Sequence, residues 1–213
     1  MRIPIHREGW PFIGLFFAAN VLLFLISAWI GWAFVPLTLW CVAFFRDPER
    51  VTPRGEGLLT SPADGVLLPV AKAVPPPELG MGPEPRVRLS VFMNVFDVHV
   101  NRFPVSGEVD IVHYNPGEFV TASLDKASLV NEQASVGIVG PRGRVLVRQI
   151  AGLIARRIVT DVAPGDAAVQ GERFGMIRFG SRVDVFLQTA AAVRVAPGQP
   201  VRAGQTVLAE YPA

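Results

Sequence analysis

The residues best suited to proton transfer gather in one short stretch, Phe92 to Pro104 (FMNVFDVHVNRFP). Side chains of an extended strand alternate between its two faces, so Asp97, His99 and Asn101 are expected to share one surface. Imidazole is the side chain most easily tuned for proton transfer near neutral pH, so His99 is the candidate base. An outward polar position on a strand is the simpler explanation for Asn101, and it also serves for Asp97.

A nucleophile occurs in a second stretch, Arg173 to Asp184 (RFGMIRFGSRVD), which Gly175 and Gly180 interrupt. Glycine permits backbone conformations closed to other residues and lets a nucleophile approach its carbonyl group. The hydroxyl of Ser181 follows directly and needs a base, for which His99 is the candidate. A glycine bulge beside an ordinary serine is the competing explanation.

A third stretch, Ser61 to Gly65 (SPADG), places Asp64 in a turn between apolar strands. Asp-Gly is a common hairpin connection. Taken alone, the stretch therefore indicates only that Asp64 is a turn former.

The elements that must position these residues are predicted to be β-strands. Beyond Phe45, short runs of alternating apolar residues are divided by Gly and Pro, which is typical of an antiparallel β domain. The clearest runs are Arg86 to Val91, Gly107 to Val112, Arg144 to Ile150 and Val183 to Leu187. Five prolines make Val74 to Pro85 a loop. Only Thr121 to Gln133 is expected to hold a helical turn.

The two ends of this domain are similar in outline. Leu58 to Val70 and Val193 to Leu208 both resemble the strand–turn–strand pieces of biotinyl/lipoyl barrel-sandwich folds. If these segments pair, the ends of the domain close upon each other. The predicted fold is therefore mainly β, a barrel-like antiparallel sandwich.

A membrane anchor is predicted in front of it. Gly9 to Phe45 is an uncharged run of 37 residues, too long for one span of about 20 residues and suited to two short helices that reverse near Ser27. Arginines flank both ends, which favours a hairpin with both ends in the cytoplasm. A cleaved signal peptide would have a shorter apolar region. The predicted division is an anchor over residues 1–45 and a catalytic domain over residues 46–213.

Composition reduces the number of function classes that fit the chain. The chain has 18 Arg against two Lys, and guanidinium groups suit anionic lipid headgroups, although a GC-rich genome explains the bias equally well. No nucleic-acid-binding motif is present, and the single cysteine, Cys41, lies in the apolar run. No Cys/His cluster has metal-ligand spacing, so neither a metal nor a disulfide is expected.

In combination and in this order, these stretches resemble the phosphatidylserine decarboxylase family, in particular its short bacterial-type branch. The resemblance covers most of the region after the anchor. It comprises Phe45-Arg46-Asp47-Pro48, SPADG, FMNVFDVHVNR, the Gly117 to Gln133 stretch (GEFVTASLDKASLVNEQ) and FGMIRFGSRVDVFL.

The resemblance implies that the chain makes its own cofactor. Ser181 attacks the carbonyl of Gly180, and an acyl shift, an elimination and a hydrolysis leave a pyruvoyl group in place of the serine. The products are a β chain, residues 1–180, and an α chain, residues 181–213, which stay associated. An Asp–His–Ser set drives the cleavage in this family and falls here on Asp64, His99 and Ser181, with the carboxylate orienting the imidazole.

The mature reaction that the resemblance implies takes place at the membrane. The amine of phosphatidylserine forms a Schiff base with the pyruvoyl ketone, CO2 leaves, His99 protonates the carbanion, and phosphatidylethanolamine is released. The catalytic domain is expected on the cytoplasmic side of the cell membrane.

One position departs from the family pattern. Many relatives carry two histidines three residues apart, and the second falls here on Arg102, which cannot act as a base. His113 is the reserve candidate for that role. Asn101, Arg102 and His113 are the further candidates for contacting the substrate.

Three alternatives remain at this point. A membrane-bound serine hydrolase would use Ser181 and His99, but the chain has no G-x-S-x-G elbow around Ser181. A lipoyl-like adaptor would need a lysine at a hairpin tip, and neither Lys72 nor Lys126 lies in one. Pyruvoyl decarboxylases of soluble amino acids would not need the anchor. The sequence leaves a homo-oligomer open.

Overall fold

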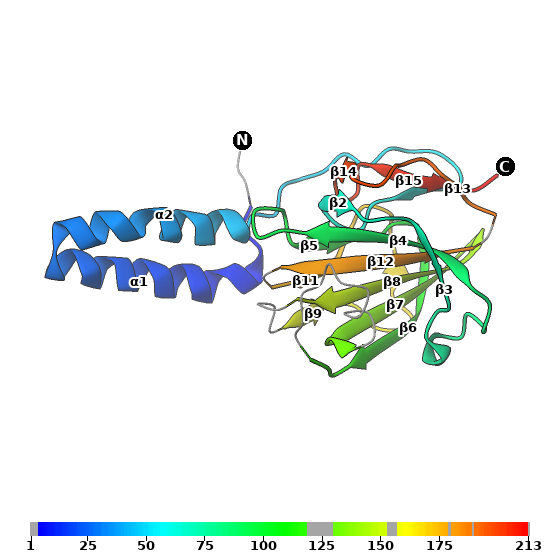
Figure 1. Cartoon of the computed structure of the whole chain (residues 1–213), viewed down its shortest axis with the longest axis horizontal. Helices are drawn as coiled ribbons and strands as arrows, with labels where there is room; N and C mark the ends of the chain where they lie inside the picture. The colour runs from blue at the N-terminus through cyan, green and yellow to red at the C-terminus, as the bar shows by residue number, and fades with distance from the viewer. Residues whose placement is uncertain (1–3, 119–129, 153–156, 179, 189, 213) are drawn as a thin grey trace. The chain divides into compact units, whose positions relative to one another are not determined.

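A computed structural model describes residues 4–118, 130–152, 157–178, 180–188 and 190–212 of the chain (Figure 1). The chain divides into two compact units, Met1–Glu49 and Arg50–Ala213, and each is described by itself. Most of the Thr121 to Gln133 segment, for which a helical turn was expected, lies outside the described residues.

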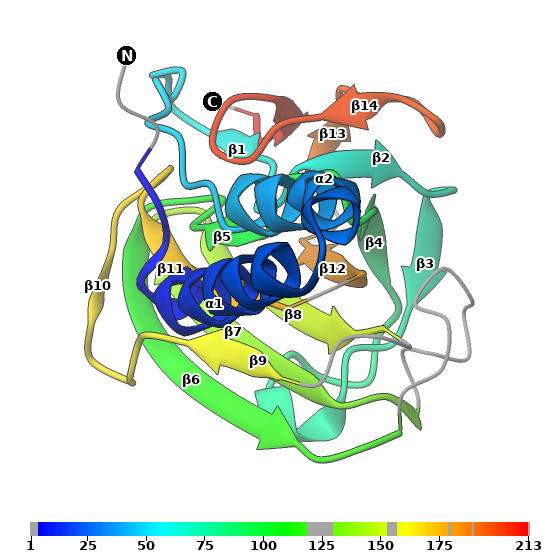
Figure 2. The same ribbon diagram turned by 90° about the vertical axis from the view of Figure 1, so that its left-hand side faces the viewer.

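The first unit is a helical hairpin. A short 3-10 helix, η1 (Arg7–Gly9), leads into α1 (Trp10–Ile26), which is followed by α2 (Ala28–Phe44). Ser27 has extended backbone angles (φ −161°, ψ 130°) and breaks the helix at the predicted point of reversal. The two helices lie side by side (Figures 1 and 2), and the Asn20 side chain of α1 donates a hydrogen bond of 3.0 Å to the Gly31 carbonyl of α2.

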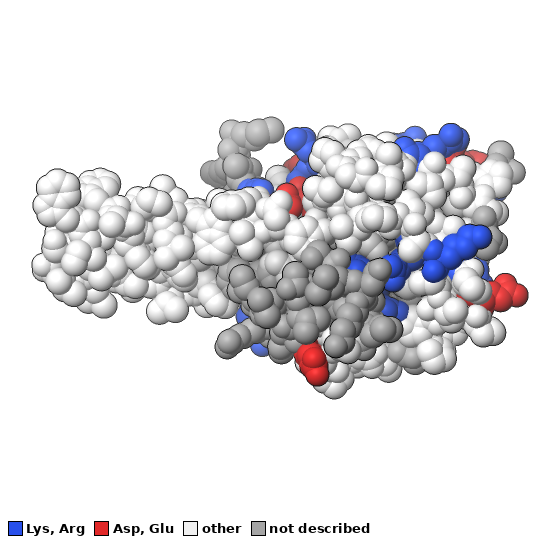
Figure 3. Space-filling view, in the orientation of Figure 1, with Lys and Arg blue, Asp and Glu red and all other residues white. Residues whose placement is uncertain are grey.

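The surface of this hairpin is apolar. Trp29 is 87% exposed and Leu25 79% exposed, and Figure 3 shows no charged side chain along most of the helical arm. The segment Arg7–Ile26 is long and apolar enough to cross a membrane, whereas Ala28–Phe44 is shorter. At 1.5 Å per residue, α2 reaches about 26 Å, slightly less than a hydrocarbon core. The hairpin indicates association with a membrane.

The second unit is built from β-strands, as predicted. They are β1 (Leu58–Thr60), β2 (Gly65–Leu67), β3 (Ala71–Ala73), β4 (Arg86–Met93), β5 (Val100–Arg102), β6 (Gly107–Asn115), β7 (Gln133–Gly140), β8 (Gly143–Ala151), β9 (Ile158–Thr160), β10 (Ala167–Ala168), β11 (Arg173–Ile177), β12 (Ser181–Leu187), β13 (Ala192–Val193), β14 (Pro200–Val201) and β15 (Val207–Glu210). A single 3-10 turn, η2 (Pro77–Leu79), lies in the proline-rich loop that precedes β4.

These strands form one large sheet and two small ones. The large sheet has nine strands in the order β10-β6-β7-β8-β12-β4-β2-β14, with β3 also paired to β4, and it curls into a half-barrel (Figures 1 and 2). The small sheets are β1-β15-β13 and β5-β11-β9. All pairings between these strands are antiparallel, which confirms the predicted class of fold. Strand β12 runs through the large sheet between β8 and β4.

The two ends of the β domain meet as predicted. Strand β1 pairs with β15, and β2 pairs with β14, so the first and last strands of the unit are neighbours. Gly65 lies in this contact with φ at +150°, and a Cβ there would be 2.1 Å from the Phe92 carbonyl oxygen. The glycine of the SPADG turn is therefore required by the close approach of β2 to β4.

Alternation along β12 decides which side chains face the core. Val183, Val185 and Leu187 are fully buried in the main apolar core, and Ser181 shares their face because it precedes Val183 by two residues. Arg182 and Asp184 point to the opposite face, where a buried ion pair joins them at 2.6 Å. Ser181 is thus directed into the concave, core side of the sheet.

Candidate active site

The Gly180–Ser181 junction lies where the chain enters the central strand. Gly180 has φ at +49°, a left-handed conformation that favours glycine, and no described atom lies within 4 Å of the place where a Cβ would be. Ser181 is fully buried, and it is paired with Met93 of β4 and Ala151 of β8. Its hydroxyl donates to the Met93 sulfur at 3.4 Å. A thioether is a weak acceptor that cannot take up this proton at neutral pH, so the contact orients the hydroxyl without activating it.

His99 lies at the end of the strand ladder that leads to this junction. The Ile177 N–H donates to the His99 carbonyl at 3.3 Å, which continues the pairing of β5 with β11, and only three residues separate Ile177 from Ser181. The imidazole is fully buried, and its Nδ1 lies 3.1 Å from the Asp97 carbonyl oxygen. Since a carbonyl can only accept, Nδ1 carries the proton and Nε2 is the basic nitrogen.

Asn101 is buried rather than outward-facing, so the simpler explanation from the sequence is wrong. Its exposed fraction is zero, and it lies inside a line of polar side chains. Thr160 donates to Gln149 Oε1 at 2.9 Å, Gln149 Nε2 donates to Asn101 Oδ1 at 2.8 Å, and Asn101 Nδ2 lies 3.9 Å from the Met93 sulfur. The sulfur therefore contacts both this line and the Ser181 hydroxyl.

Asp97 does not share the strand face on which it was expected. The strand begins only at Val100, and Asp97 closes a turn by accepting a hydrogen bond of 2.9 Å from the Asn94 N–H. The motif therefore consists of a turn followed by a short strand, because the Asp97 and Asn94 side chains both bond to nearby backbone groups.

The carboxylate of Asp64 is held by groups far away in the sequence. Arg50 Nη2 donates to Asp64 Oδ2 at 2.8 Å, and the Ala203 N–H donates to Oδ1 at 2.7 Å. Arg50 also donates to the Gln205 side chain at 2.8 Å. The Asp64–His99 contact that the family resemblance implies is not among the hydrogen bonds of the described residues, and the orienting role of Asp64 stays a prediction.

Arg102 is almost completely buried, and its guanidinium donates to the Gly171 carbonyl at 2.8 Å. This hydrogen bond connects β5 to the turn before β11. The hydrogen bonds of the described residues do not test a substrate contact by Arg102, so that contact also stays a prediction.

His113 lies on the other side of the large sheet. His113 is paired with Ser135, Ser135 with Arg148, and Arg148 with Asp184. Paired residues point to the same face, and Asp184 points to the face opposite Ser181. Strand β6 is also three positions from β12, about 14 Å at the usual strand spacing. Its Nε2 instead meets the Asn115 side chain at 2.9 Å. This placement counts against His113 as a reserve base for Ser181.

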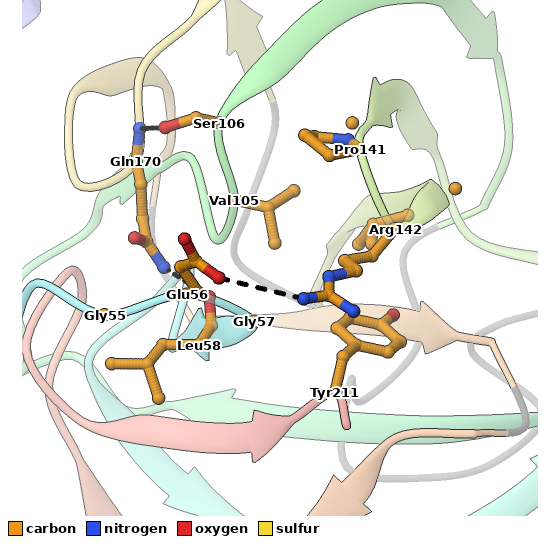
Figure 4. Close-up of a pocket in the computed structure, with 13 residues that line it drawn as sticks. Gly55, Glu56, Gly57, Leu58, Val105, Ser106, Pro141, Arg142, Gln170 and Tyr211 are labelled. Carbon is orange, nitrogen blue, oxygen red and sulfur yellow. Dashed lines mark hydrogen bonds and ion pairs between the residues drawn. The ribbon is translucent and has the colours of Figure 1, made fainter. Parts of the chain in front are cut away.

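A cavity of about 370 Å³ lies at the other end of the sheet (Figure 4). Arg142, Tyr211 and the Gly143 backbone line it, and Arg142 forms an exposed ion pair of 4.0 Å with Glu56. Burial raises the pKa of the Tyr211 phenol. Gly143 is eight residues along β8 from Ala151, the partner of Ser181, or about 26 Å. The cavity contains neither Ser181 nor His99 and is separate from the candidate site.

Sequence reasoning missed Gln149, Met93 and Arg50. Gln149 carried a usable signal, because it follows Val145 and Val147 at the two-residue spacing of a core-facing strand. A polar amide on an apolar face needs a buried partner, and here that partner is Asn101. Nothing in the local sequence marks Arg50 or Met93 as partners of Asp64 or Ser181.

Together, the antiparallel β fold and the buried serine directly after a left-handed glycine define the candidate site, and a buried histidine, His99, lies on the strand ladder that leads to it. A family model described as phosphatidylserine decarboxylase matches residues 37–209. The chain belongs to the phosphatidylserine decarboxylase family. It is 56% identical over 208 residues to a phosphatidylserine decarboxylase proenzyme of Cereibacter sphaeroides (strain ATCC 17025 / ATH 2.4.3), and the match covers 97% of this chain and 90% of that protein.

Proposed function

We propose that this chain is the precursor of a pyruvoyl-dependent decarboxylase that converts phosphatidylserine to phosphatidylethanolamine and CO2. The observation that carries the proposal is the Gly180–Ser181 junction, with a buried hydroxyl directly after a left-handed glycine. Family membership supplies the substrate class, and the name proenzyme of the relative is in keeping with a chain that must be processed.

Self-cleavage begins with attack of Ser181 Oγ on the Gly180 carbonyl carbon. The new C–O bond replaces the C–N bond, and the hydroxyl proton passes through His99 to the departing nitrogen, so that an ester joins the two residues. Removal of the Ser181 α-proton then expels the Gly180 carboxylate. The remaining dehydroalanine takes up one water and releases ammonia, which leaves a pyruvoyl group at the new N-terminus.

The residues around Ser181 fit such a group. The position is the first of β12, between β4 and β8, and among the described residues no atom lies within 4 Å of the place where a Cβ on Gly180 would be, which supports room for a ketone in place of the serine. When formed, the pyruvoyl group supplies a ketone that binds the substrate amine and accepts the electrons released with CO2. His99 then returns a proton to the carbon that has lost CO2, and Asn101, which is also fully buried, is a further candidate for contacting the substrate.

The cut chains are expected to stay together. Residues 181–213 contribute β12, β14 and β15, and these pair with β4, β8, β2 and β1 of residues 1–180. Residues 1–45 act as the membrane anchor of a catalytic domain over residues 46–213. Arginines on both flanks of the apolar run support a position of that domain on the cytoplasmic side of the cell membrane.

The test is the intact mass of the wild-type chain and of Ser181→Ala, both purified in detergent and recorded under denaturing conditions. The wild type should give two fragments that meet at Gly180/Ser181, the C-terminal one lighter than a serine-started peptide by one ammonia. Ser181→Ala should stay whole. An uncut wild-type chain that decarboxylates phosphatidylserine in vesicles would refute the pyruvoyl cofactor.

A further inference from the structure

The buried amide of Gln149 connects the two parts of the fold that carry the reacting groups. Gln149 belongs to β8 of the large sheet, two residues from Ala151, the direct partner of Ser181. Its hydrogen-bond partners, Asn101 and Thr160, belong to the small β5-β11-β9 sheet. His99 precedes Asn101 by two residues and directly precedes β5, the first strand of that small sheet.

The geometry of the small sheet makes room for this side chain. Asn101, Gly175 and Thr160 are aligned across its three strands. Aligned residues of a sheet point to the same face, so Asn101 and Thr160 flank a gap above Gly175. Gln149 fills that gap, and a Cβ on Gly175 would be 3.3 Å from Gln149 Nε2. The glycine that interrupts β11 is thus the site where an amide from another sheet enters.

The hydrogen bonds also fix the direction of the amides. The Pro62 carbonyl can only accept, which turns the Asn101 NH2 group toward it, so Asn101 Oδ1 accepts from the Gln149 NH2 group and Gln149 Oε1 accepts from the Thr160 hydroxyl. Asn101 Nδ2 lies 3.4 Å from the Pro62 carbonyl oxygen and 3.9 Å from the Met93 sulfur. Reversing either amide would bring two oxygens together in a site without exposed surface, which costs free energy.

We propose that Gln149 is a positioning residue for self-cleavage: its amide, held by Thr160, docks β5, the strand that directly follows His99, onto β8, the strand paired with Ser181. The proposal rests on the proposed function, because it states that Gln149 sets the distance between the base, His99, and the nucleophile, Ser181, of that reaction. Gln149 does not touch the reacting atoms. It acts by holding Asn101, and through Asn101 the backbone of β5.

The test follows cleavage after a short pulse of labelled amino acid in cell-free synthesis of the full chain in detergent micelles. Gln149→Met keeps the length of the side chain and removes both hydrogen bonds. Since a misplacement of about 1 Å can cost about a hundredfold in rate, cleavage of Gln149→Met should be slower by at least about tenfold. Thr160→Val, which loses only the hydroxyl, should be slowed by several-fold, and Thr160→Ser, which keeps it, should cleave like the wild type.

A second readout separates positioning from a general loss of structure. Neutral hydroxylamine cuts esters and spares amides. Limited proteolysis first checks that uncut Gln149→Met is as resistant as Ser181→Ala and is therefore folded. This folded, uncut Gln149→Met chain should remain whole in hydroxylamine, because the attack of Ser181 has not taken place.

Three results would overturn the assignment: wild-type cleavage rates in folded Gln149→Met, equal slowing by Thr160→Val and Thr160→Ser, or folded Gln149→Met that hydroxylamine splits at Gly180/Ser181. The last would place the defect after the acyl shift. In each case a wild-type chain that cleaves leaves the proposed function intact, whereas a wild-type chain that stays whole contradicts the proposed function itself.

Discussion

Removal of Arg50 from its ion pair with Asp64 should be one of the most destabilising single substitutions in the β domain. Their side chains are 10% and 12% exposed, and Arg50 Nη2 lies 2.8 Å from Asp64 Oδ2. Arg50→Met removes a hydrogen bond to a charged group, worth about 1.5–3 kcal/mol, and leaves a mostly buried carboxylate without its cation. Breaking a buried pair on one side costs about 3–5 kcal/mol, and the residual exposure places the expected loss near the lower end, about 3 kcal/mol.

The assay is thermal unfolding in the Ser181→Ala background, in which the chain should stay whole. For a domain of this size, about 3 kcal/mol corresponds to a decrease in Tm of about 6–12 °C. Arg194→Met is the matched control, because Arg194 meets Glu210 at the same 2.8 Å but with 56% and 41% exposure. An exposed pair contributes about 0.2–1 kcal/mol, so the control should shift Tm by less than about 4 °C. Equal shifts in the two variants would refute the argument from burial.

Three further predictions follow from the same structure. Gly175→Ala should destabilise the domain by about 1–3 kcal/mol, because its Cβ would lie 2.3 Å from the Val159 carbonyl oxygen; an unchanged melting curve would contradict this. His99→Gln should leave the chain uncut in denaturing mass spectra while His113→Gln is cut normally, since His99 lies on the ladder that leads to the junction and His113 lies on the opposite face of the large sheet; a cut His99→Gln chain would remove His99 as the base. Removal of residues 1–45 should abolish co-flotation with lipid vesicles, because the exposed apolar surface of the hairpin goes with them; full flotation of the shortened protein would disprove the anchor.

Much of the fold is predictable because local patterns and tertiary structure agree. The alternation in Val183 to Leu187 and the reversal at Ser27 are both local signals, and the structure has them where they were expected. Asn101 was misjudged because polar residues on strands usually face water, whereas here a partner from another sheet compensates its burial.

Contacts between residues far apart in the sequence could not be predicted. Asp64 accepts a hydrogen bond from the N–H of Ala203, 139 residues further along the chain, and no local pattern in the sequence indicates that contact. The Gly–Ser junction could be located from the motif, but its burial on the concave face depends on the register of β12 with β4 and β8. Register of this kind is set by the whole sheet.

Under the proposed chemistry, the central position of β12 would link cofactor formation to the completion of folding. Both partners of β12, β4 and β8, precede it in the chain, so β12 leaves the ribosome after them and is inserted between strands already made. Under the proposed chemistry, Ser181 meets its surroundings only when that insertion has succeeded. A misfolded molecule would therefore remain without a cofactor, and a cut chain would be one in which the sheet had formed at least once. Cofactor formation could not be repeated after unfolding, because a mature α chain no longer has the peptide bond from which the cofactor was formed.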